Sequence, residues 1–239
     1  SARYAIDLIA QGHVGEIRGV TMSVGVDAFG PELPSRHAWV LDPAAFVSLL
    51  PVYFGHFADL LFATVGPPST LTAVSENQFP IVTLTDTGEQ VPYPVPTEVM
   101  MVGNLQRGGL FSIQLEGGQG HHKTGLRIVI TGTEGALRIS NPRAFENEQE
   151  NAIEEMTGDA TSCSPLAIPE RYVLLRDDDL DQSVRDVAYL YNAYAQDVRN
   201  GGSTVSDFTD AVNLHRLIDQ VTRSSAGSSQ AAQNNVRWG

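Results

Sequence analysis

The apolar residues of this chain are densest in one stretch, from Ser48 to Pro67, which reads SLLPVYFGHFADLLFATVGP. Within it, His56 and Asp59 stand three residues apart, a spacing that places two side chains on one face of a helix. Gly66 and the prolines after it end the pattern. The stretch predicts an apolar helix that carries an imidazole and a carboxylate on one side, with a break or kink near Pro51.

Two interpretations of His56 stay open on local chemistry alone. An ionisable side chain kept on an apolar helix is a candidate acid or base, and Asp59 is then placed to orient it or to contact polar substrate groups. Alternatively, His56 is a structural residue that caps or hydrogen-bonds neighbouring backbone, because leaving a buried polar group unpaired costs roughly 1–3 kcal/mol.

Simpler patterns precede this stretch. Residues 1–12 carry an apolar stripe that predicts a helix, and the alternation over 16–29 predicts a strand. A polar loop follows over 30–39. Asp42 and Pro43 then have the chemistry of an N-cap and a first helical residue, so they predict the start of the helix that leads into the apolar stretch.

Beyond Pro68 the pattern changes to strands and turns. Residues 70–76 alternate, whereas the proline-containing residues 85–97 predict a loop or an extended edge. Two hairpins are predicted, with their turns at 107–109 and 132–135. Together these segments give five or six antiparallel strands, with a further one possible at 172–175.

The last third of the chain predicts two helices after a polar region. Residues 141–169 are rich in glutamate and predict a solvated loop, and the acidic run 177–181 lacks the glycine and closing glutamate of an EF-hand calcium loop. Ser183 and Ser206 are the predicted helix caps, and Asn200-Gly201-Gly202 ends the first helix. The predicted inner residues are Val187, Leu190, Tyr191 and Tyr194, then Val212, Leu214, Leu217, Ile218 and Val221. Residues 224–239 predict a flexible tail after a domain that covers 1–223.

Composition narrows the possible functions. The chain has 239 residues and a formal net charge of −13, from 28 acidic and 15 basic residues. This balance argues against nucleic acid and anionic membrane surfaces as direct partners. Cys163 is the single cysteine, which excludes an internal disulfide and a cysteine-rich metal site. With no secretory signal and no apolar run of about 20 residues, we expect a cytoplasmic protein, cut from something longer because it begins within an element.

Few other motifs carry chemistry. A strand-linked Gly-x-Gly-x-x-Gly, a phosphate loop and a Gly-x-Ser-x-Gly elbow are all missing from the sequence. Residues 117–120 are glycine-rich but open no predicted helix, and His121-His122-Lys123 predicts a solvated turn, so we expect no metal site. His56 is therefore the catalytic candidate. Arg36 and Trp39 are secondary candidates with Asp59 for substrate binding, because a guanidinium and an aromatic ring suit sugar hydroxyls and apolar sugar faces.

Five stretches in this order resemble the C-terminal domain of the glucose–fructose oxidoreductase / inositol dehydrogenase / MocA (Gfo/Idh/MocA) oxidoreductase family. They are YAIDLIAQGHVGEI (4–17), FGHFAD (54–59), NLQRGGLFSIQLEGG (104–118), IVITGTEGALRI (128–139) and FTDAVNLHRLIDQV (208–221). The nearest likeness is to the branch that contains the galactose-pathway repressor. The resemblance implies an α+β fold with an open, mainly antiparallel sheet and helices on one face, like the C-terminal domain of dihydrodipicolinate reductase.

The resemblance also implies a function. Full members have an N-terminal Rossmann domain that binds NAD or NADP, which this chain lacks, so we expect no cofactor on this fragment alone. The implied activity is that of a sugar or polyol dehydrogenase, with His56 as acid/base and a homo-oligomer formed through the sheet face. Active members often place Asp four residues before the histidine, where this chain has Val52. That departure supports an alternative function. In it, the protein is a non-catalytic, repressor-like regulator that senses a sugar or nucleotide.

Overall fold

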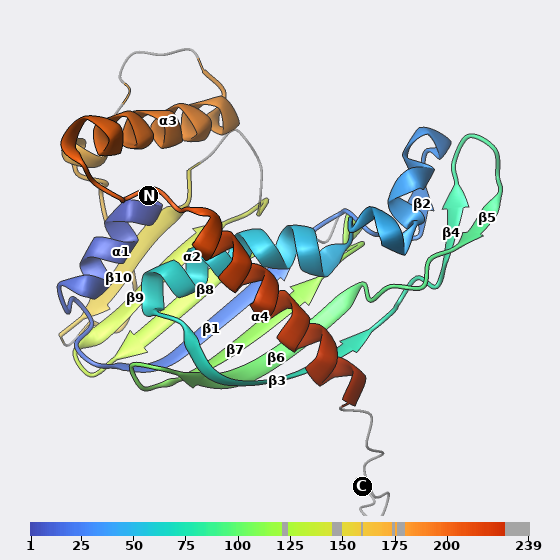
Figure 1. Cartoon of the computed structure of the whole chain (residues 1–239). Coiled ribbons are helices and arrows are strands. Elements are labelled where there is room, and N and C mark those ends of the chain that lie inside the picture. The colour runs from blue at the N-terminus through green and yellow to red at the C-terminus, as the bar shows by residue number, and fades with distance from the viewer. Residues whose placement is uncertain (121–123, 145–149, 159, 174, 176–179, 228–239) are drawn as a thin grey trace, which may run out of the picture.

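A large sheet occupies the centre of the molecule in this computed structural model, which describes residues 1–120, 124–144, 150–158, 160–173, 175 and 180–227 (Figure 1). Its eight strands are β1 (Ile17–Gly25), β3 (Pro68–Glu76), β6 (Glu98–Leu105), β7 (Leu110–Glu116), β8 (Gly125–Gly132), β9 (Gly135–Asn141), β10 (Ala152–Thr157) and β11 (Ser164–Pro165). Both predicted hairpins are present, as β6–β7 and β8–β9.

The strand order is β11-β10-β9-β8-β1-β7-β6-β3. Only the β1–β7 pair is parallel among the neighbours in this sheet, because β1 enters the centre between the two hairpins. In the β1–β7 register Val20 lies beside Phe111 and Met22 beside Ile113, and all four side chains are buried. The alternation of β1 therefore puts one apolar row of side chains under the helices.

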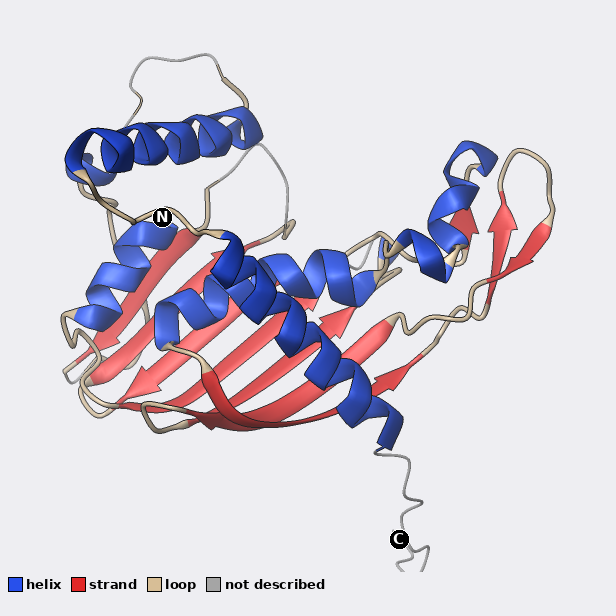
Figure 2. Ribbon diagram, in the orientation of Figure 1, coloured by secondary structure: helices blue, strands red, loops and turns tan. Residues whose placement is uncertain are grey.

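Helices α1 (Ala2–Ala10), α2 (Gly55–Val65) and α4 (Phe208–Gly227) lie over one face of this sheet, whereas α3 (Gln182–Asn200) stands farther from it (Figures 1 and 2). On α2, Ala58 and Leu61 are completely buried in the core shared with the sheet. The structure thus confirms the predicted α+β class, with a large, mostly antiparallel sheet and helices packed against it.

A second, smaller unit extends beyond one end of the large sheet (Figure 1). Its sheet has the order β2-β4-β5 and consists of β2 (Glu32–Leu33), β4 (Ile81–Leu84) and β5 (Gln90–Pro92). Short helices join it to α2, namely η1 (Ser35–Leu41), η2 (Pro43–Ala45) and η3 (Leu49–Phe54). The proline-containing segment predicted as a loop or edge thus contributes the edge strand β5, where a proline needs no ladder partner for its nitrogen.

The predicted break near Pro51 is present as a turn of π-helix. Pro51 lies within η3, which has the wide π geometry, and the regular α-helix α2 begins directly after it. Proline has no N–H to donate, and a widened turn accommodates that loss. Asp42 acts as a cap, as predicted, since its Oδ1 accepts the Ala44 N–H at 2.9 Å. It caps only η2, however, because Phe46 adopts a left-handed conformation (φ 55°) that ends this short helix.

One segment in the described part of the chain, Pro43–Val65, is long and apolar enough to match a membrane span by length and composition. Its side chains at Phe54, Ala58 and Leu61 are fully buried in the core of the large sheet. Burial of this kind is typical of a central helix in a globular domain.

Several sequence predictions about the last third of the chain are wrong. Residues 141–169 are not only a loop, because β10 and β11 extend the sheet there. In place of a strand near 172, the short helix η5 (Glu170–Tyr172) is present. Asp207 caps α4 instead of Ser206, since its Oδ1 accepts the N–H groups of Thr209 and Asp210. Ser183 lies inside α3, after the N-cap Asp181.

The predicted inner stripe of α3 also faces outward, because Val187, Leu190, Tyr191 and Tyr194 are 52–69% exposed. Its helix does end as predicted, at Gly201 in a left-handed conformation. On α4 the prediction is better, since Ile218 and Val221 are buried, although Val212 is 46% exposed. This helix continues to Gly227, and residues 177–179 and 228–239 lie outside the described residues.

Candidate functional site

His56 is the second residue of α2, directly after the π-helical η3, and its side chain is exposed. The neighbours of His56 on the helix, Gly55 and Phe57, are buried. The helix thus keeps its apolar residues in the core and presents the imidazole on its surface. The location fits a residue that contacts a ligand or partner, and it leaves His56 outside the apolar core.

Asp59 is the other ionisable group on this face of α2. It lines a groove of about 470 Å³ between α2 and α4, together with Phe62, Asp210, Asn213 and Arg216 among others. Partial burial raises the pKa of the Asp59 carboxyl, and the negative charge of Asp210 raises it further, whereas His56 lowers it. His56 and Asp59 therefore interact electrostatically, as their spacing predicts, but Asp59 also belongs to a pair of carboxyl groups that sequence reasoning missed.

Arg36 and Trp39 lie on η1, beside the small sheet, and both side chains are exposed. Arg36 donates from its Nε to His37 Nε2 at 3.0 Å, and Trp39 is 59% exposed. Neither residue lines the groove that contains Asp59. The four residues predicted for one site thus come from two regions, the surface of α2 and the η1 helix.

Val52, at the position where related dehydrogenases often have a carboxylate, lies on η3. It lines an apolar cavity between η1, η3 and the small sheet. This cavity does not include His56 or Asp59. The chain thus offers an aliphatic side chain, facing other apolar groups, where an oriented acid would be needed to hold the imidazole.

The glycine-rich turn at 117–120 does not fit a nucleotide phosphate. The N–H groups of Gly117, Gly118 and Gln119 already donate to the carbonyl oxygens of Thr97, Ala28 and Val26 at 2.8–3.0 Å. A Cβ atom at Gly118 would meet the Phe79 ring at 2.4 Å. Phosphate loops need free N–H groups and an open approach, so the close packing of this turn explains its glycines. His121, His122 and Lys123 lie outside the described residues, and among those described no cluster of three His, Cys, Asp or Glu side chains could hold a metal ion.

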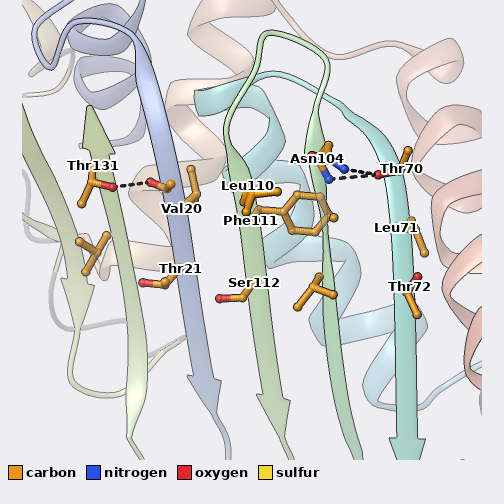
Figure 3. A pocket seen from close by; sticks show the side chains of 14 residues that line it. Val20, Thr21, Thr70, Leu71, Thr72, Asn104, Leu110, Phe111, Ser112 and Thr131 are labelled. Carbon is orange, nitrogen blue, oxygen red and sulfur yellow. Dashed lines mark hydrogen bonds between the residues drawn. The ribbon is translucent and has the colours of Figure 1, made fainter. Parts of the chain in front are cut away.

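A second candidate surface is the uncovered face of the large sheet, which has a shallow hollow of about 590 Å³ (Figure 3). Hydroxyl groups of Thr21, Thr72 and Ser112 alternate there with apolar side chains (Figure 3). Val102 and Leu110 are 56% and 63% exposed. Such a mixed surface is typical of protein contact faces, which combine apolar contacts with scattered hydrogen-bonding groups.

The chain belongs to a class of proteins built on this α+β domain, in which both sugar dehydrogenases and regulators occur among the solved structures of similar fold. The family model described as the Gal80p C-terminal domain matches residues 1–141, more than half of the chain. The chain therefore belongs to the Gal80p C-terminal domain family. The resemblance predicted from the sequence, including its nearest branch, is confirmed.

Two curated relatives are regulators of galactose and lactose metabolism. GAL80 of Saccharomyces cerevisiae is 26% identical over 271 residues, which covers 97% of this chain and 62% of that protein. GAL80 of Kluyveromyces lactis is 28% identical over 151 residues, or 59% of this chain and 33% of that protein. The chain thus spans less than two thirds of the length of these relatives.

The solved structures of similar fold include both classes. A super-repressor mutant of Gal80p from S. cerevisiae aligns with a TM-score of 0.81 and 23% identity, over 98% of this chain and 62% of that one. Levoglucosan dehydrogenase in complex with NADH and L-sorbose aligns with a TM-score of 0.75 and 19% identity, over 93% and 60%. These similarities establish the shared fold.

The comparisons correct the partners predicted from the sequence. We expected a sugar or polyol and a second copy of the chain as partners, and neither nucleic acid nor a membrane. The relatives are instead named as metabolic regulatory proteins, and one solved structure as a transcriptional regulator. The acidic net charge argues only against direct contact with phosphates, so it did not exclude a protein that acts on transcription through other proteins.

Proposed function

We propose that this chain is the non-catalytic regulatory domain of a Gal80-like transcriptional regulator, which acts by binding another protein. The observation that carries this proposal is Val52, an aliphatic residue that lines an apolar cavity, at the position where active dehydrogenases of the resembled family often have an Asp. Family membership supports the same conclusion. His56, Asp59, Arg36 and Trp39 are then contact residues for a ligand or partner.

The exposure of His56 supports this role. General acid–base catalysis needs a group held within hydrogen-bond reach of the reacting atoms and tuned in its pKa. On the same face of α2, burial raises the pKa of the Asp59 carboxyl, and Asp210, which lines the groove between α2 and α4, raises it further. Asp59 and Asp210 therefore form part of a groove between two helices, beside the exposed His56, and such a groove suits recognition of a partner segment.

We further propose that two copies associate through the uncovered face of the large sheet. Helices cover only the opposite face (Figure 1), and Val74, Met100, Val102 and Leu110 on the uncovered side are 43–63% exposed. Exposed apolar side chains on adjacent strands usually mark an interaction surface. A self-complementary face of this kind suits a twofold dimer.

In this proposal, a cofactor such as NAD or NADP binds to the full-length protein and not to this chain alone. Levoglucosan dehydrogenase, which shares the fold, is described with NADH, and we expect that NAD or NADP binding in a full-length regulator would require residues beyond this chain. The packed turn at 117–120 supports weak or no dinucleotide binding by the chain alone. A location in the cytoplasm or nucleus is consistent with this function.

The competing function is an NAD(P)-dependent dehydrogenase in which His56 is the acid/base. The decisive experiment uses the full-length protein and measures both properties in parallel. Repression of a galactose-inducible reporter in cells that lack their own Gal80 regulator, with no reduction of NAD⁺ or NADP⁺ over a sugar panel, supports the regulator. Turnover that falls by on the order of 10²–10⁴ in His56→Ala would establish the dehydrogenase.

A further inference from the structure

The uncovered face of the large sheet has a projection and a depression side by side near its centre. Gly19 of β1 is in register with Leu110 of β7, whose side chain is 63% exposed. Both residues line the hollow of about 590 Å³. Glycine has no side chain, so the strand surface is low at Gly19 and high at Leu110. In a twofold contact the same surface occurs on both partners, so this projection can fill the other copy's depression.

The next row of the same two strands carries hydroxyl groups. Thr21 of β1 is in register with Ser112 of β7, and their side chains lie beside each other on the uncovered face (Figure 3). A hydroxyl group both donates and accepts, so either one can bind a copy of the other. None of the described residues that line the hollow is charged, so two such faces can meet there without burying an unpaired charge.

A third pair lies on the strands that flank β1 and β7. Val129 of β8 and Val102 of β6 are in the same row as the two hydroxyl groups, and Val102 is 56% exposed. The two valines are far apart within one chain, because β1 and β7 lie between their strands. The row therefore reads valine, hydroxyl, hydroxyl, valine, which is the same from either end and can pair with a copy of itself.

We propose that two copies of this chain pair about a twofold axis that runs between β1 and β7, parallel to both strands. The axis sets β1 of each copy on the partner's β7, and β8 on the partner's β6, with the strands aligned as in stacked sheets. Leu110 of each copy then enters the depression at the partner's Gly19. The hydroxyl groups of the next row meet, and so do its valines. This pairing rests on the dimer proposed above and specifies which residues meet.

Neighbouring axes join groups that do not match. An axis along β7 would set Leu110 against the partner's Leu110, so two projections would collide. An axis along β1 would set two depressions at Gly19 against each other. It would also place Ser112 against the partner's Val129 and bury a hydroxyl group without a partner. The axis between the two strands is the arrangement in which apolar groups meet apolar groups and hydroxyl groups meet hydroxyl groups.

The test places opposite charges at Val102 and Val129, which meet only across this axis. Val102→Lys and Val129→Glu are prepared separately as whole chains, and analytical ultracentrifugation measures the dissociation constant of each variant and of their mixture. Alone, each should dimerise on the order of 10²-fold more weakly than the unaltered chain, because its charge is buried without a partner. In the mixture the lysine meets the glutamate, so we expect a heterodimer within about tenfold of the unaltered dimer.

Val74→Glu is the matched control, because Val74 is 50% exposed on β3 of the same face and lies opposite the partner's β9 instead of its β6. Mixed with Val102→Lys, it should not restore association. Equal recovery with Val74→Glu would show that opposite net charge is sufficient, and no recovery with either glutamate would show that other rows meet. Both results would overturn this register and leave a dimer through the sheet in place.

Gly19→Ala gives an independent measurement and needs no new charge. Its methyl group would lie 3.2 Å from the Thr131 hydroxyl oxygen of the same chain, a contact that a small shift relieves, and would occupy the depression. We expect about tenfold weaker dimerisation from this overpacking. Gly227→Ala is the control, since that methyl group would lie in open space at the end of α4, and it should leave the dissociation constant unchanged.

Dimerisation of Gly19→Ala that is as tight as that of the unaltered chain would overturn the pairing with Leu110. Thermal melting of every variant shows whether it is folded. An unaltered chain that is monomeric at tens of micromolar would overturn the dimer and this register together. The reporter assay tests the regulatory function separately, so failure of the register, of the dimer and of the regulator are distinguishable.

Discussion

Asp59 of α2 and Asp210 of α4 line one groove, and the charge of Asp210 adds to partial burial in raising the pKa of the Asp59 carboxyl. The two helices are far apart in the sequence, and Asp210 is held in place by the cap of α4, where its Oδ2 accepts the Asp207 N–H at 2.9 Å. The charge of Asp210 thus disfavours the ionised form of Asp59, in a groove that Arg216 also lines.

Removing this repulsion should stabilise the fold near neutral pH. Since the folded-state pKa of Asp59 is raised, its favourable contribution is full below the ordinary value of 3.8 and is lost as the pH rises through the raised value. Asp59→Asn should therefore melt about 1–2 °C higher than the unaltered chain at pH 7, a small effect because the side chain is partly exposed. The two proteins should melt together at pH 3.

Asp219→Asn is the matched control, because Asp219 is exposed on α4 and lies outside the groove. It should leave the melting temperature unchanged at both pH values. If Asp59→Asn lowers the melting temperature at pH 7, the attraction to His56 outweighs the repulsion by Asp210.

His56 and Leu61 allow the surface and core of α2 to be compared within one helix. His56→Ala should change the free energy of unfolding by less than about 0.5 kcal/mol, as is usual for exposed positions. Leu61 is fully buried, so Leu61→Ala should cost about 2–5 kcal/mol. Urea denaturation of both variants measures these values. If His56→Ala instead lowers the free energy of unfolding by about 1 kcal/mol or more, His56 is a structural residue that caps or hydrogen-bonds neighbouring backbone.

The sequence predicted most of the sheet because its strands have local signals. Glycine turns and alternating residues mark both hairpins, and the turn at 107–109 joins β6 to β7 as expected. The strand β10 was missed because Glu154 and Glu155 read as solvated residues. In the fold Glu154 pairs with Arg138, and Glu155 contacts His13 at 2.6 Å, partners 16 and 142 residues away.

The candidate site was predictable only in part, for a similar reason. The helical spacing of His56 and Asp59 is local, so the sequence placed them together. Asp210 comes from a distant segment, and its position has no distinguishing local pattern. The stripe of α3 was assigned to the inside because helical periodicity identifies an apolar face but not what it faces.

The ion pair between Arg138 and Glu154 should make the attachment of β10 depend on pH. Arg138 Nε donates to Glu154 Oε2 at 2.6 Å, directly across the β9–β10 pair, and this bond lowers the pKa of Glu154. A lowered folded-state pKa gives stability that is present above the ordinary value, 4.5, and is lost as the pH falls through the lowered one. Glu154→Gln should cost up to about 1 kcal/mol at pH 7.

That cost should be smaller at pH 3 than at pH 7, because pH 3 lies below the ordinary value of 4.5 and closer to the lowered pKa of Glu154. Hydrogen exchange of the β10 amides, followed at both pH values, reports the local effect. Glu89→Gln is the control, since Glu89 is exposed on the β4–β5 turn. An equal acceleration of exchange in Glu154→Gln at pH 3 and pH 7 would show that the side chain acts through packing and not through its charge.

The proposed dimer can be tested at Leu110, which is 63% exposed on the uncovered sheet face beside Asn104 of β6 (Figure 3). A carboxylate here would be buried without a partner when two faces meet, at a cost of several kcal/mol. Leu110→Glu should therefore weaken self-association by on the order of 10²-fold or more, without lowering the melting temperature of the monomer, since the side chain already faces solvent.

Analytical ultracentrifugation across a range of protein concentrations measures that shift. Val198→Glu is the control, because Val198 is 66% exposed on α3 and away from the sheet face. It introduces the same charge, so it should leave the dissociation constant unchanged if the sheet is the interface. Equal weakening by both substitutions would mean that net charge, already −13, drives the copies apart. A chain that is monomeric at tens of micromolar would contradict the proposed dimer.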